Sequence, residues 1–504
     1  MTDTLDITPF TDTDPDEFLT SPPLRRLGQR LARLGLALAA LIILLSAGAT
    51  PPSPTEVPPP VGIVPIPTYD FRPVEALCAD LNAAWDRDWL TVIAALERLD
   101  QIGGVCGDKI PREQLYPAYF NYGAWLERRG ELAEAILAYQ KALDLRPDGK
   151  EAALALQRHR ALQPPPLTIC TEAEIDAALN VVGVWTPAAV GAFPRLEQGR
   201  FMINDVPFTV RGVNYYPSNA PWRRFLTEGD LDSIRAELDL IRGAGFNTIR
   251  VFLWHDALFQ CPGSGAVPKP EGFARLDAVL RMAAERGLRL IVTLNDLPDL
   301  VVRPLYLQSD LPNAQALFIV RRYRDEPAIL AWDVRNEGDI DASRKYVTLR
   351  AVMDWLRAFV PQVRAADPNH LITAGWNESS HLTAGVVDFL SFHHWRSAEN
   401  MAERIAGMRA ATALPILLEE VGYATPGGTE ARQVDSLRAA LRMAEGQNLL
   451  GWLVWTAFDF PRTATCIPPA CPSLDNAEHH YGMWRTDYSE KPALRMLKEE
   501  FLGR

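Results

Sequence analysis

Two glutamates in the C-terminal half of the sequence each end an apolar segment. Glu337 closes "AWDVRNE", where a run of Ala, Trp and Val typical of a buried strand stops at a carboxylate beside the amide of Asn336. Glu420 closes "PILLEE" in a similar way. A carboxylate at a strand end can simply be solvated, or it can be held there for chemistry. Two such groups that face each other, one protonated and one ionised, are what the cleavage of a glycosidic bond requires.

Other apolar segments also carry polar or aromatic side chains near their ends. The segments "TIRVFLW", "FLSFHHW" and "GWLVWTAF" contain Arg250, His393 and Trp455. His255 and Asp256 come directly after the first of them. In barrels of parallel strands, active sites lie at the C-terminal ends of the strands. One polar residue at a strand end can be a solvated side chain. Several strands whose polar ends meet on one rim of a barrel instead indicate an active site.

These residues lie in a region where short apolar runs alternate with amphipathic stretches. The apolar runs are eight in number: "FTVRGVNYY", "TIRVFLW", "LRLIVTL", "ILAWDV", "HLITAG", "FLSFHHW", "PILLEE" and "GWLVWTAF". Stretches such as "LDSIRAELDLIRGAG" read as helices closed by a glycine. Apolar strands joined by helices predict a parallel sheet covered on both faces, and eight units predict an α/β fold, a (β/α)₈ TIM barrel, over 194–504.

Within such a barrel, strands four and seven lie opposite each other, which would bring Glu337 and Glu420 together. Strand alternation places Ile416, Leu418 and Glu420 on one face and turns Glu419 to the other. Glu419 is the alternative if this strand is bulged. The segment "RLEQGRFMINDVPF" precedes the first strand and predicts a hairpin over the bottom of the barrel.

The N-terminus carries a membrane signal. Four arginines precede the apolar run "LGLALAALIILLSAGA". They predict a cytoplasmic tail over 1–30, a single-pass transmembrane helix over 31–50 and an extracytoplasmic remainder. The run is short for a full span of about 20 residues, and "AGA" also fits a signal cleavage site. We expect an uncleaved anchor at the cell membrane because the tail is long, and a secreted protein if the run is cleaved. A Pro-rich linker, 51–68, follows.

A helical segment over 69–165 comes next. Its clearest part, "YPAYFNYGAWLERRGELAEAILAYQKALDLRPDG", places six residues at the offsets of a tetratricopeptide repeat: Gly123, Gly130, Ala135, Tyr139, Ala142 and Pro147. The segment therefore resembles that family, as a small all-α domain before the barrel. The resemblance leaves two readings open, a docking surface for a protein partner and a plain structural spacer. We expect a second linker over 166–193.

Composition excludes some functions. The net charge of −12 over 504 residues argues against a nucleic-acid partner, which needs a basic face. The six cysteines are an even number, so disulfides are permitted in a chain expected to leave the cytoplasm. Cys466 and Cys471 are the first pair to test. Their spacing is not that of a zinc site, so no metal is implied.

The segment from about Gly199 to Leu502 resembles a clan A glycoside hydrolase and is closest in motif to family 5, which includes β-mannanases and cellulases. The matching pieces are "RGVNYYP", "GFNTIRVF", "RYRDEPAILAWDVRNE", "PILLEEVG", "GWLVWTAF" and "YGMWRTDYSEKPAL". The resemblance implies that Glu337 is the acid/base, that Glu420 is the nucleophile and that Asn336 holds the sugar 2-hydroxyl.

Further substrate-binding residues follow from the same resemblance. Arg250 matches the arginine that orients the nucleophile, His393 the histidine near the cleavage site, and Trp455 the floor under the sugar ring. The family usually has a tyrosine where this chain has Trp395, so the hydroxyl that would hold the nucleophile must come from elsewhere. Three candidates for it are Tyr215, Tyr216 and Tyr423. A family histidine after the third strand is replaced by "TLNDLPD", with Asn295 and Asp296.

The leading hypothesis is a membrane-anchored retaining β-glycoside hydrolase that acts on a β-linked polysaccharide or oligosaccharide, without metal or organic cofactor. One alternative is a non-catalytic carbohydrate-binding or scaffold protein, because two rim positions depart from the family pattern. A transglycosylase is the other, since it uses the same residues and differs only in the acceptor.

Overall fold

The computed structural model describes residues 73–107, 110–129, 131–159, 168–189, 191–296, 305–306, 308–343, 347–425, 430–466, 472–473 and 475–503. The predicted cytoplasmic tail, transmembrane helix and Pro-rich linker lie outside these residues. Within the described residues, every helix is too short or too polar to cross a bilayer. The prediction of a membrane anchor therefore falls on residues for which the structure gives no description.

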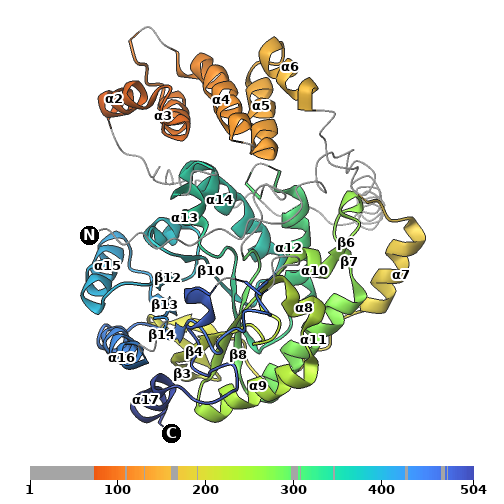
Figure 1. Ribbon diagram of the computed structural model, residues 1–504, viewed down its shortest axis with the longest axis vertical. Coiled ribbons are helices and arrows are strands. Elements are labelled where there is room, and N and C mark those ends of the chain that lie inside the picture. Colours follow the sequence, from red (N-terminus) through yellow and green to blue (C-terminus); the bar gives the residue numbers. More distant parts are fainter. Residues whose placement is uncertain are drawn as a thin grey trace, which may run out of the picture.

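The large C-terminal region is a barrel of parallel strands surrounded by helices (Figure 1). Its strands are β4 (Val210–Asn214), β5 (Thr248–Phe252), β8 (Arg289–Thr293), β9 (Ile329–Asp333), β10 (Leu371–Thr373), β11 (Gly375–Trp376), β12 (Leu390–His394), β13 (Ile416–Val421) and β14 (Gly451–Val454). The sheet runs in the order β10-β9-β8-β5-β4-β14-β13-β12-β11. Because β10 and β11 are separated by Ala374 alone, they are two halves of one strand, and this strand closes the ring. The predicted TIM barrel is confirmed, with all eight apolar runs as its strands.

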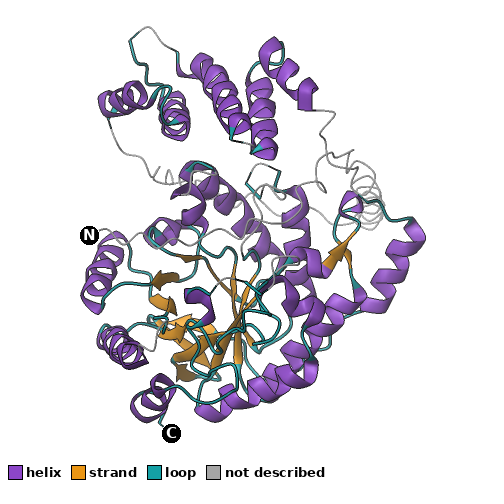
Figure 2. Ribbon diagram, viewed as in Figure 1, coloured by secondary structure: helices purple, strands orange, loops and turns teal. Residues whose placement is uncertain are grey.

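The helices form the outer layer around the strands (Figure 2). The longer ones are α9 (Leu231–Ala244), α11 (Pro270–Glu285), α12 (Asp310–Tyr323), α14 (Leu349–Ala366), α15 (Ala398–Ala411), α16 (Glu430–Gly446) and α17 (Pro492–Glu500). In α9, Asp230 caps the N-terminus by accepting from the Ser233 N–H, and Gly245 follows the last residue with a φ of 105°. The residues between these caps bury one apolar face against the sheet, as the sequence pattern predicts.

Shorter elements lie in the connections between strands and helices. They are η2 (Trp222–Arg224), α8 (Phe225–Glu228), α10 (His255–Leu258), β6 (Phe259–Gln260), η3 (Pro262–Ser264), β7 (Val267–Pro268), α13 (Gly338–Ser343), η4 (Ser380–Gly385) and η5 (Ala477–His479). Two of them, α13 and η5, follow strands β9 and β14 and therefore lie on the C-terminal side of the barrel.

The bottom of the barrel is closed by a small antiparallel sheet. Its strands are β1 (Arg195–Glu197), β2 (Arg200–Ile203) and β3 (Val206–Phe208). Phe201 of β2 is fully buried in a cluster with residues from the N-terminal ends of the barrel strands, among them Val210, Leu417 and Leu450. The predicted hairpin over the bottom of the barrel is therefore confirmed, and it leaves the opposite, C-terminal face for a site.

The helices between residues 73 and 159 have a hydrophobic core of their own. They are α2 (Val74–Ala84), α3 (Trp89–Ile102), α4 (Pro111–Arg128), α5 (Leu132–Leu145) and α6 (Lys150–His159). Helices α4 and α5 pack closely, and a Cβ at Gly123 would lie 2.7 Å from the Tyr139 ring. Cys78 and Cys106 form a disulfide within this segment. The helical character is confirmed, whereas membership of the tetratricopeptide family stays a prediction.

The interval 166–193, expected as a linker, contains helix α7 (Glu172–Val182). Thr171 and Glu174 form a capping box at its start. Two features fasten this interval to the barrel. Cys170 forms a disulfide with Cys261, and the carboxylate of buried Glu326 accepts hydrogen bonds from the Trp185 indole and from two backbone N–H groups.

The helical segment contacts the barrel through α3 and α14, which lie one above the other in Figure 1. Arg350 of α14 donates to the carbonyl of Glu97 at 3.3 Å and to the side chain of Gln101 at 2.8 Å. A pocket of about 340 Å³ separates the start of α3 from α13 and the start of α14. Its lining includes Asp339, two residues after Glu337, but neither of the two candidate catalytic glutamates.

Candidate active site

Glu337 lies just beyond the end of β9, at the C-terminal face of the barrel. Its φ of 47° is in the left-handed region, which a residue with a side chain seldom adopts. Two hydrogen bonds fix this turn: the Glu337 N–H donates to the Gly375 carbonyl at 2.6 Å, and the Asn336 N–H donates to the Asn295 carbonyl at 3.0 Å. The turn leads the carboxylate toward the next strands rather than along its own strand.

Glu420 lies near the end of β13, where the pairing with β14 shifts register between Leu418 and Val421. This irregularity defeats the simple alternation argument, because Glu419 does not turn away from the barrel interior. Arg250 contacts both glutamates: its Nη1 forms a close ion pair with Glu420, and its Nε lies 3.6 Å from Oε1 of Glu419. Glu419 is completely buried, whereas the Glu420 side chain retains 4% exposure. Glu420 is therefore the glutamate nearer the opening.

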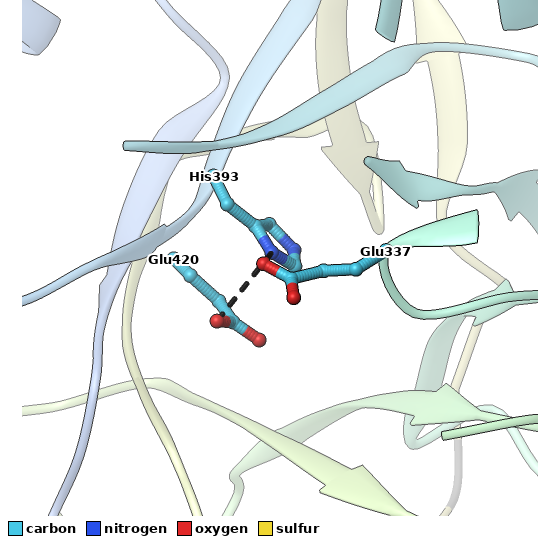
Figure 3. Close-up of side chains that lie close together, drawn as sticks. All are labelled: Glu337, His393 and Glu420. Atoms are coloured by element: carbon cyan, nitrogen blue, oxygen red, sulfur yellow. Dashed lines mark hydrogen bonds and ion pairs between the residues drawn. The ribbon is translucent and has the colours of Figure 1, made fainter. Parts of the chain in front are cut away.

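His393 of β12 lies between the two candidate catalytic glutamates. Its Nδ1 is 2.9 Å from Oε1 of Glu337 and 3.4 Å from Oε2 of Glu420. The ligand atoms of the three side chains all lie within 4.8 Å of one another. Figure 3 shows the two carboxylates entering from different strands and pointing toward each other beside the imidazole ring. The structure thus brings together the carboxylates of Glu337 and Glu420, which are 83 positions apart in the sequence.

Arg250 is the central cation beneath these groups, and its side chain is fully buried. Its Nη2 donates to Oδ2 of Asp333 at 2.6 Å and to Oδ1 of Asn336 at 2.8 Å, and its Nη1 reaches Asn214 at 3.1 Å. Burial alone would lower the pKa of Arg250, but the surrounding carboxylates outweigh burial and raise it. A permanent guanidinium charge here favours the ionised form of Glu420.

Asn336 has a fixed amide orientation. Its Oδ1 accepts from Arg250, and its Nδ2 donates to Oδ1 of Asp296 at 3.1 Å. Asp296 also accepts a short hydrogen bond from the Tyr216 hydroxyl, which accepts in turn from the Trp254 indole at 3.1 Å. Burial raises the pKa of Asp296 to about 6. The sequence flagged Asp296 only as a departure from the family pattern, and the structure shows that it anchors Asn336.

None of the three tyrosines considered as a substitute for the missing hydroxyl reaches Glu420. The Tyr215 hydroxyl donates to Glu237 at 2.7 Å, that of Tyr216 donates to Asp296, and that of Tyr423 donates to the Arg396 carbonyl at 2.6 Å. These three hydroxyls serve structural contacts. Among the described residues, Arg250 and His393 are the groups that hold the Glu420 carboxylate.

The protonation of the site depends on the coupling between these groups. Burial raises the pKa of Glu420 to about 7, although His393 and Arg250 act against it. For Glu337, burial also raises the pKa, but the hydrogen bond and charge of His393 outweigh burial and hold the pKa below its ordinary value. Burial lowers the pKa of His393, and the neighbouring carboxylates more than reverse this, to about 10. These directions favour a protonated His393, whose Nδ1 lies 2.9 Å from Oε1 of Glu337.

Aromatic side chains line the same end of the barrel. Trp455, directly after β14, meets Phe252 edge to face at 5.7 Å between ring centroids. Trp395, after β12, meets Tyr481 at 5.7 Å, also edge to face. A Cβ at Gly422 would lie 3.1 Å from the Tyr481 ring and 3.2 Å from the Trp395 ring, so these two rings close over the end of β13. Tyr481 begins the matching segment "YGMWRTDYSEKPAL", but the sequence predicts no role for it at the site.

The carboxylates and imidazole of Glu337, His393 and Glu420 are also groups that divalent metals bind. The arrangement can therefore be described in two ways, as an acid and nucleophile pair or as a metal site. Direct contact of Glu420 with the buried Arg250 guanidinium favours the first, because a cation already occupies the position next to that carboxylate.

Comparison with known proteins finds relatives of the barrel. The family model described as cellulase, glycosyl hydrolase family 5, matches residues 207–458. Mannan endo-1,4-beta-mannosidase A of Podospora anserina is 27% identical over 308 residues, which cover 49% of this chain and 80% of that protein. The putative mannan endo-1,4-beta-mannosidase 9 of Oryza sativa subsp. japonica is 26% identical over 376 residues, covering 59% of this chain and 89% of that protein.

Solved structures share the fold. The exo-beta-1,4-mannosidase Op5Man5 from Opitutaceae bacterium strain TAV5 superposes with a TM-score of 0.52 at 22% identity, covering 60% of this chain and 61% of that chain. The GH5_18 protein from Streptomyces cattleya in complex with GlcNAc gives a TM-score of 0.50 at 22% identity, covering 62% of this chain and 80% of that chain. At this identity the two structures support the barrel architecture alone.

Proposed function

Because the chain belongs to glycosyl hydrolase family 5, the cellulase family, and is a glycoside hydrolase, we propose that it cleaves β-glycosidic bonds with retention of configuration. Glu420 is the nucleophile and Glu337 the acid/base in this proposal. The observation that carries it is the meeting of these two carboxylates around His393 at the C-terminal face of the barrel.

In the first step, a carboxylate oxygen of Glu420 forms a bond to the anomeric carbon while the bond from that carbon to the leaving oxygen breaks. Glu337 gives its proton to the leaving oxygen. The Arg250 guanidinium keeps Glu420 ionised for the attack. His393 holds the proton before the reaction, and the hydrogen bond of 2.9 Å to Glu337 is the path by which Glu337 receives it.

In the second step, Glu337 removes a proton from a water molecule as that water attacks the anomeric carbon. The bond to Glu420 breaks, and the sugar leaves with its original configuration. Asn336 holds the sugar 2-hydroxyl in this scheme, Trp455 supports the apolar face of the ring, and Trp395 lines the opening. No metal or organic cofactor takes part in either step.

For the substrate, we propose a β-linked mannan or manno-oligosaccharide. Support comes from the mannan endo-1,4-beta-mannosidases to which the chain is similar. The experiment measures hydrolysis of β-1,4-mannan, β-1,4-glucan and aryl β-glycosides by the purified protein and by Glu337→Ala, Glu420→Ala and Glu403→Ala. Glu403 is an exposed glutamate of α15 and serves as the matched control. We expect the first two variants to lose activity and the control to keep it, whereas full activity of either active-site variant would overturn the assignment.

Transfer to a sugar acceptor would use the same groups, with a hydroxyl in place of water. Product analysis by mass spectrometry at high oligosaccharide concentration separates the two reactions. Free reducing ends equal to the bonds cleaved support hydrolysis, and products longer than the substrate support transfer.

We further propose that the barrel works outside the cytoplasm, held at the membrane by 31–50. The disulfides Cys78–Cys106 and Cys170–Cys261 support an oxidising location. The expected pair Cys466 and Cys471 involves Cys471, which lies outside the described residues. Protease treatment of intact cells, followed by detection of the barrel, tests this location. Protection of the barrel until the membrane is broken would contradict it.

A further inference from the structure

Glu478 is a third carboxylate at the open end of the barrel, and the proposed reaction does not use it. It lies in η5, in the long connection that follows β14. Its Oε2 accepts a hydrogen bond from the Trp455 indole Nε1 at 3.3 Å. Trp455 is the proposed floor for the sugar ring, so Glu478 lies at the edge of that floor.

The backbone around Glu478 is held by a dense set of contacts. The Glu478 N–H donates to Oδ1 of Asn476 at 2.9 Å, and the His479 ring accepts from the Asn476 N–H at 3.0 Å and contacts Thr465 at 2.8 Å. One residue further, the His480 carbonyl accepts from the Lys491 ammonium at 3.0 Å. Contacts on both sides of the residue fix the position of the carboxylate without using the carboxylate itself.

The Glu478 carboxylate can accept more hydrogen bonds than the one it accepts among the described residues. An ionised carboxylate accepts about four hydrogen bonds, and the indole N–H is the donor found for it among the residues that the structure describes. The residue is partly buried, and burial, helped by the nearby charge of Glu337, raises the pKa of Glu478 to about 7. A partly buried carboxylate with unused lone pairs can accept hydrogen bonds from a ligand that lies beside it.

Trp455, the proposed floor for the sugar ring, lies next to the nucleophile Glu420. This position indicates which group of the ligand Glu478 would bind. The backbone N–H of Trp455 donates to the carbonyl of Val421, the residue after Glu420, at 2.9 Å. A sugar attacked by Glu420 while it lies on Trp455 would turn its ring hydroxyls outward, in the plane of the indole edge. Those hydroxyls are the donors that Glu478 lacks.

We propose that Glu478 is a substrate-binding residue that determines specificity, its carboxylate accepting hydrogen bonds from ring hydroxyls of the sugar whose anomeric bond is cleaved. The inference rests on the proposed function and deepens it. The carboxylate selects sugars that carry hydroxyls at the ring positions remote from the anomeric carbon. It also selects against substrates with a negative charge there.

The experiment measures kcat/KM for an aryl β-mannoside and for its 4-deoxy and 6-deoxy analogues. The proteins are the wild type, Glu478→Ala, Glu478→Gln and the control Asp475→Ala. Asp475 is an exposed carboxylate of the same loop that contacts His480. For the wild type and the control, we expect removal of a contacted hydroxyl to lower kcat/KM about 10- to 100-fold. For Glu478→Ala we expect the parent and the deoxy substrates to differ by less than about twofold.

The pattern across substrates separates recognition from simple support of Trp455. If Glu478 only positioned the indole, its removal would lower kcat/KM for all three substrates by one common factor, and the wild-type preference for the hydroxyl would remain. That result would overturn the inference while leaving hydrolysis intact. Absence of hydrolysis by the wild-type protein would instead count against the proposed function and the inference together.

Discussion

The imidazole Nδ1 of His393 lies 2.9 Å from the carboxylate Oε1 of Glu337, at the C-terminal face of the barrel. The same nitrogen is 3.4 Å from Glu420. One histidine thus lies beside both glutamates that are proposed to cleave the bond.

The pH dependence of kcat/KM should report this arrangement. Glu420 must be ionised to attack, and its pKa of about 7 is raised, so activity should fall as the pH drops below about 7. The proton on His393, with a pKa of about 10, must be present for transfer to Glu337, so activity should fall again above about pH 10. We expect a bell-shaped profile with its maximum between these values.

His393→Asn should narrow the pH range over which kcat/KM is high, on both the acidic and the alkaline side. Loss of the imidazolium charge removes an influence that lowers the pKa of Glu420, so the acidic limb should move to higher pH. Loss of the titrating ring should move the alkaline limb to lower pH. A variant whose profile superimposes on that of the wild type would show that His393 has no part in the proton transfer.

Arg250→Met should destabilise the barrel and abolish activity. The substitution leaves buried Asp333 and Glu419 without their cation, and loss of one partner of a buried ion pair costs about 3–5 kcal/mol. Urea unfolding measures this cost. Arg250→Lys keeps the charge but not the planar fork, so its loss of stability should be smaller. Equal urea midpoints for the wild type and Arg250→Met would contradict the buried network.

Gly375→Ala should destabilise the barrel and lower activity, because it adds a methyl group directly below the active site. A Cβ at this position would collide with Oε2 of Glu419 and lie 2.8 Å from Nε2 of His393. We expect a loss of about 1–3 kcal/mol in unfolding free energy, as for other overpacked cores, together with a lower kcat. Gly407→Ala is the control, because a Cβ there meets nothing within 4 Å in helix α15. If both alanine variants behaved alike, the packing beneath His393 would be looser than described.

Removal of metal should leave hydrolysis unchanged. The three ligand atoms within 4.8 Å of one another could also hold a cation, but the proposed double displacement uses none. Activity measured after dialysis against EDTA, and again after addition of Zn²⁺, Mn²⁺ or Ca²⁺, checks this. Activity that is lost on dialysis and restored by one ion would replace the proposal with a metal-dependent reaction.

The sequence predicted the barrel well because its strands are continuous apolar runs, and each of the eight runs became a strand. It also brought Glu337 and Glu420 together, since strand order alone places them on one rim. Strand alternation failed at Glu419, because a register shift in β13 is a tertiary feature without a local sequence signal.

Other parts of the site were out of reach of sequence patterns. Asp296 and Glu478 lie in connections after the strands, where periodicity says nothing about side-chain direction, and their partners Asn336 and Trp455 are far away in the chain. Tyr215, Tyr216 and Tyr423 are the sequence candidates for the missing tyrosine hydroxyl, but each donates to an acceptor other than Glu420. The prolines before the interval 166–193 predict a linker, whereas the structure forms helix α7 there.

The most direct test of the central claim is covalent trapping of the nucleophile. A 2,4-dinitrophenyl 2-deoxy-2-fluoro-β-glycoside of the sugar that the enzyme hydrolyses forms the first intermediate and then releases it slowly. Peptide mass spectrometry of the inactivated protein locates the attached sugar. The account predicts one sugar per chain, on Glu420, with no label in the Glu420→Ala variant. A sugar attached to Glu419, or to any residue other than Glu420, would contradict it.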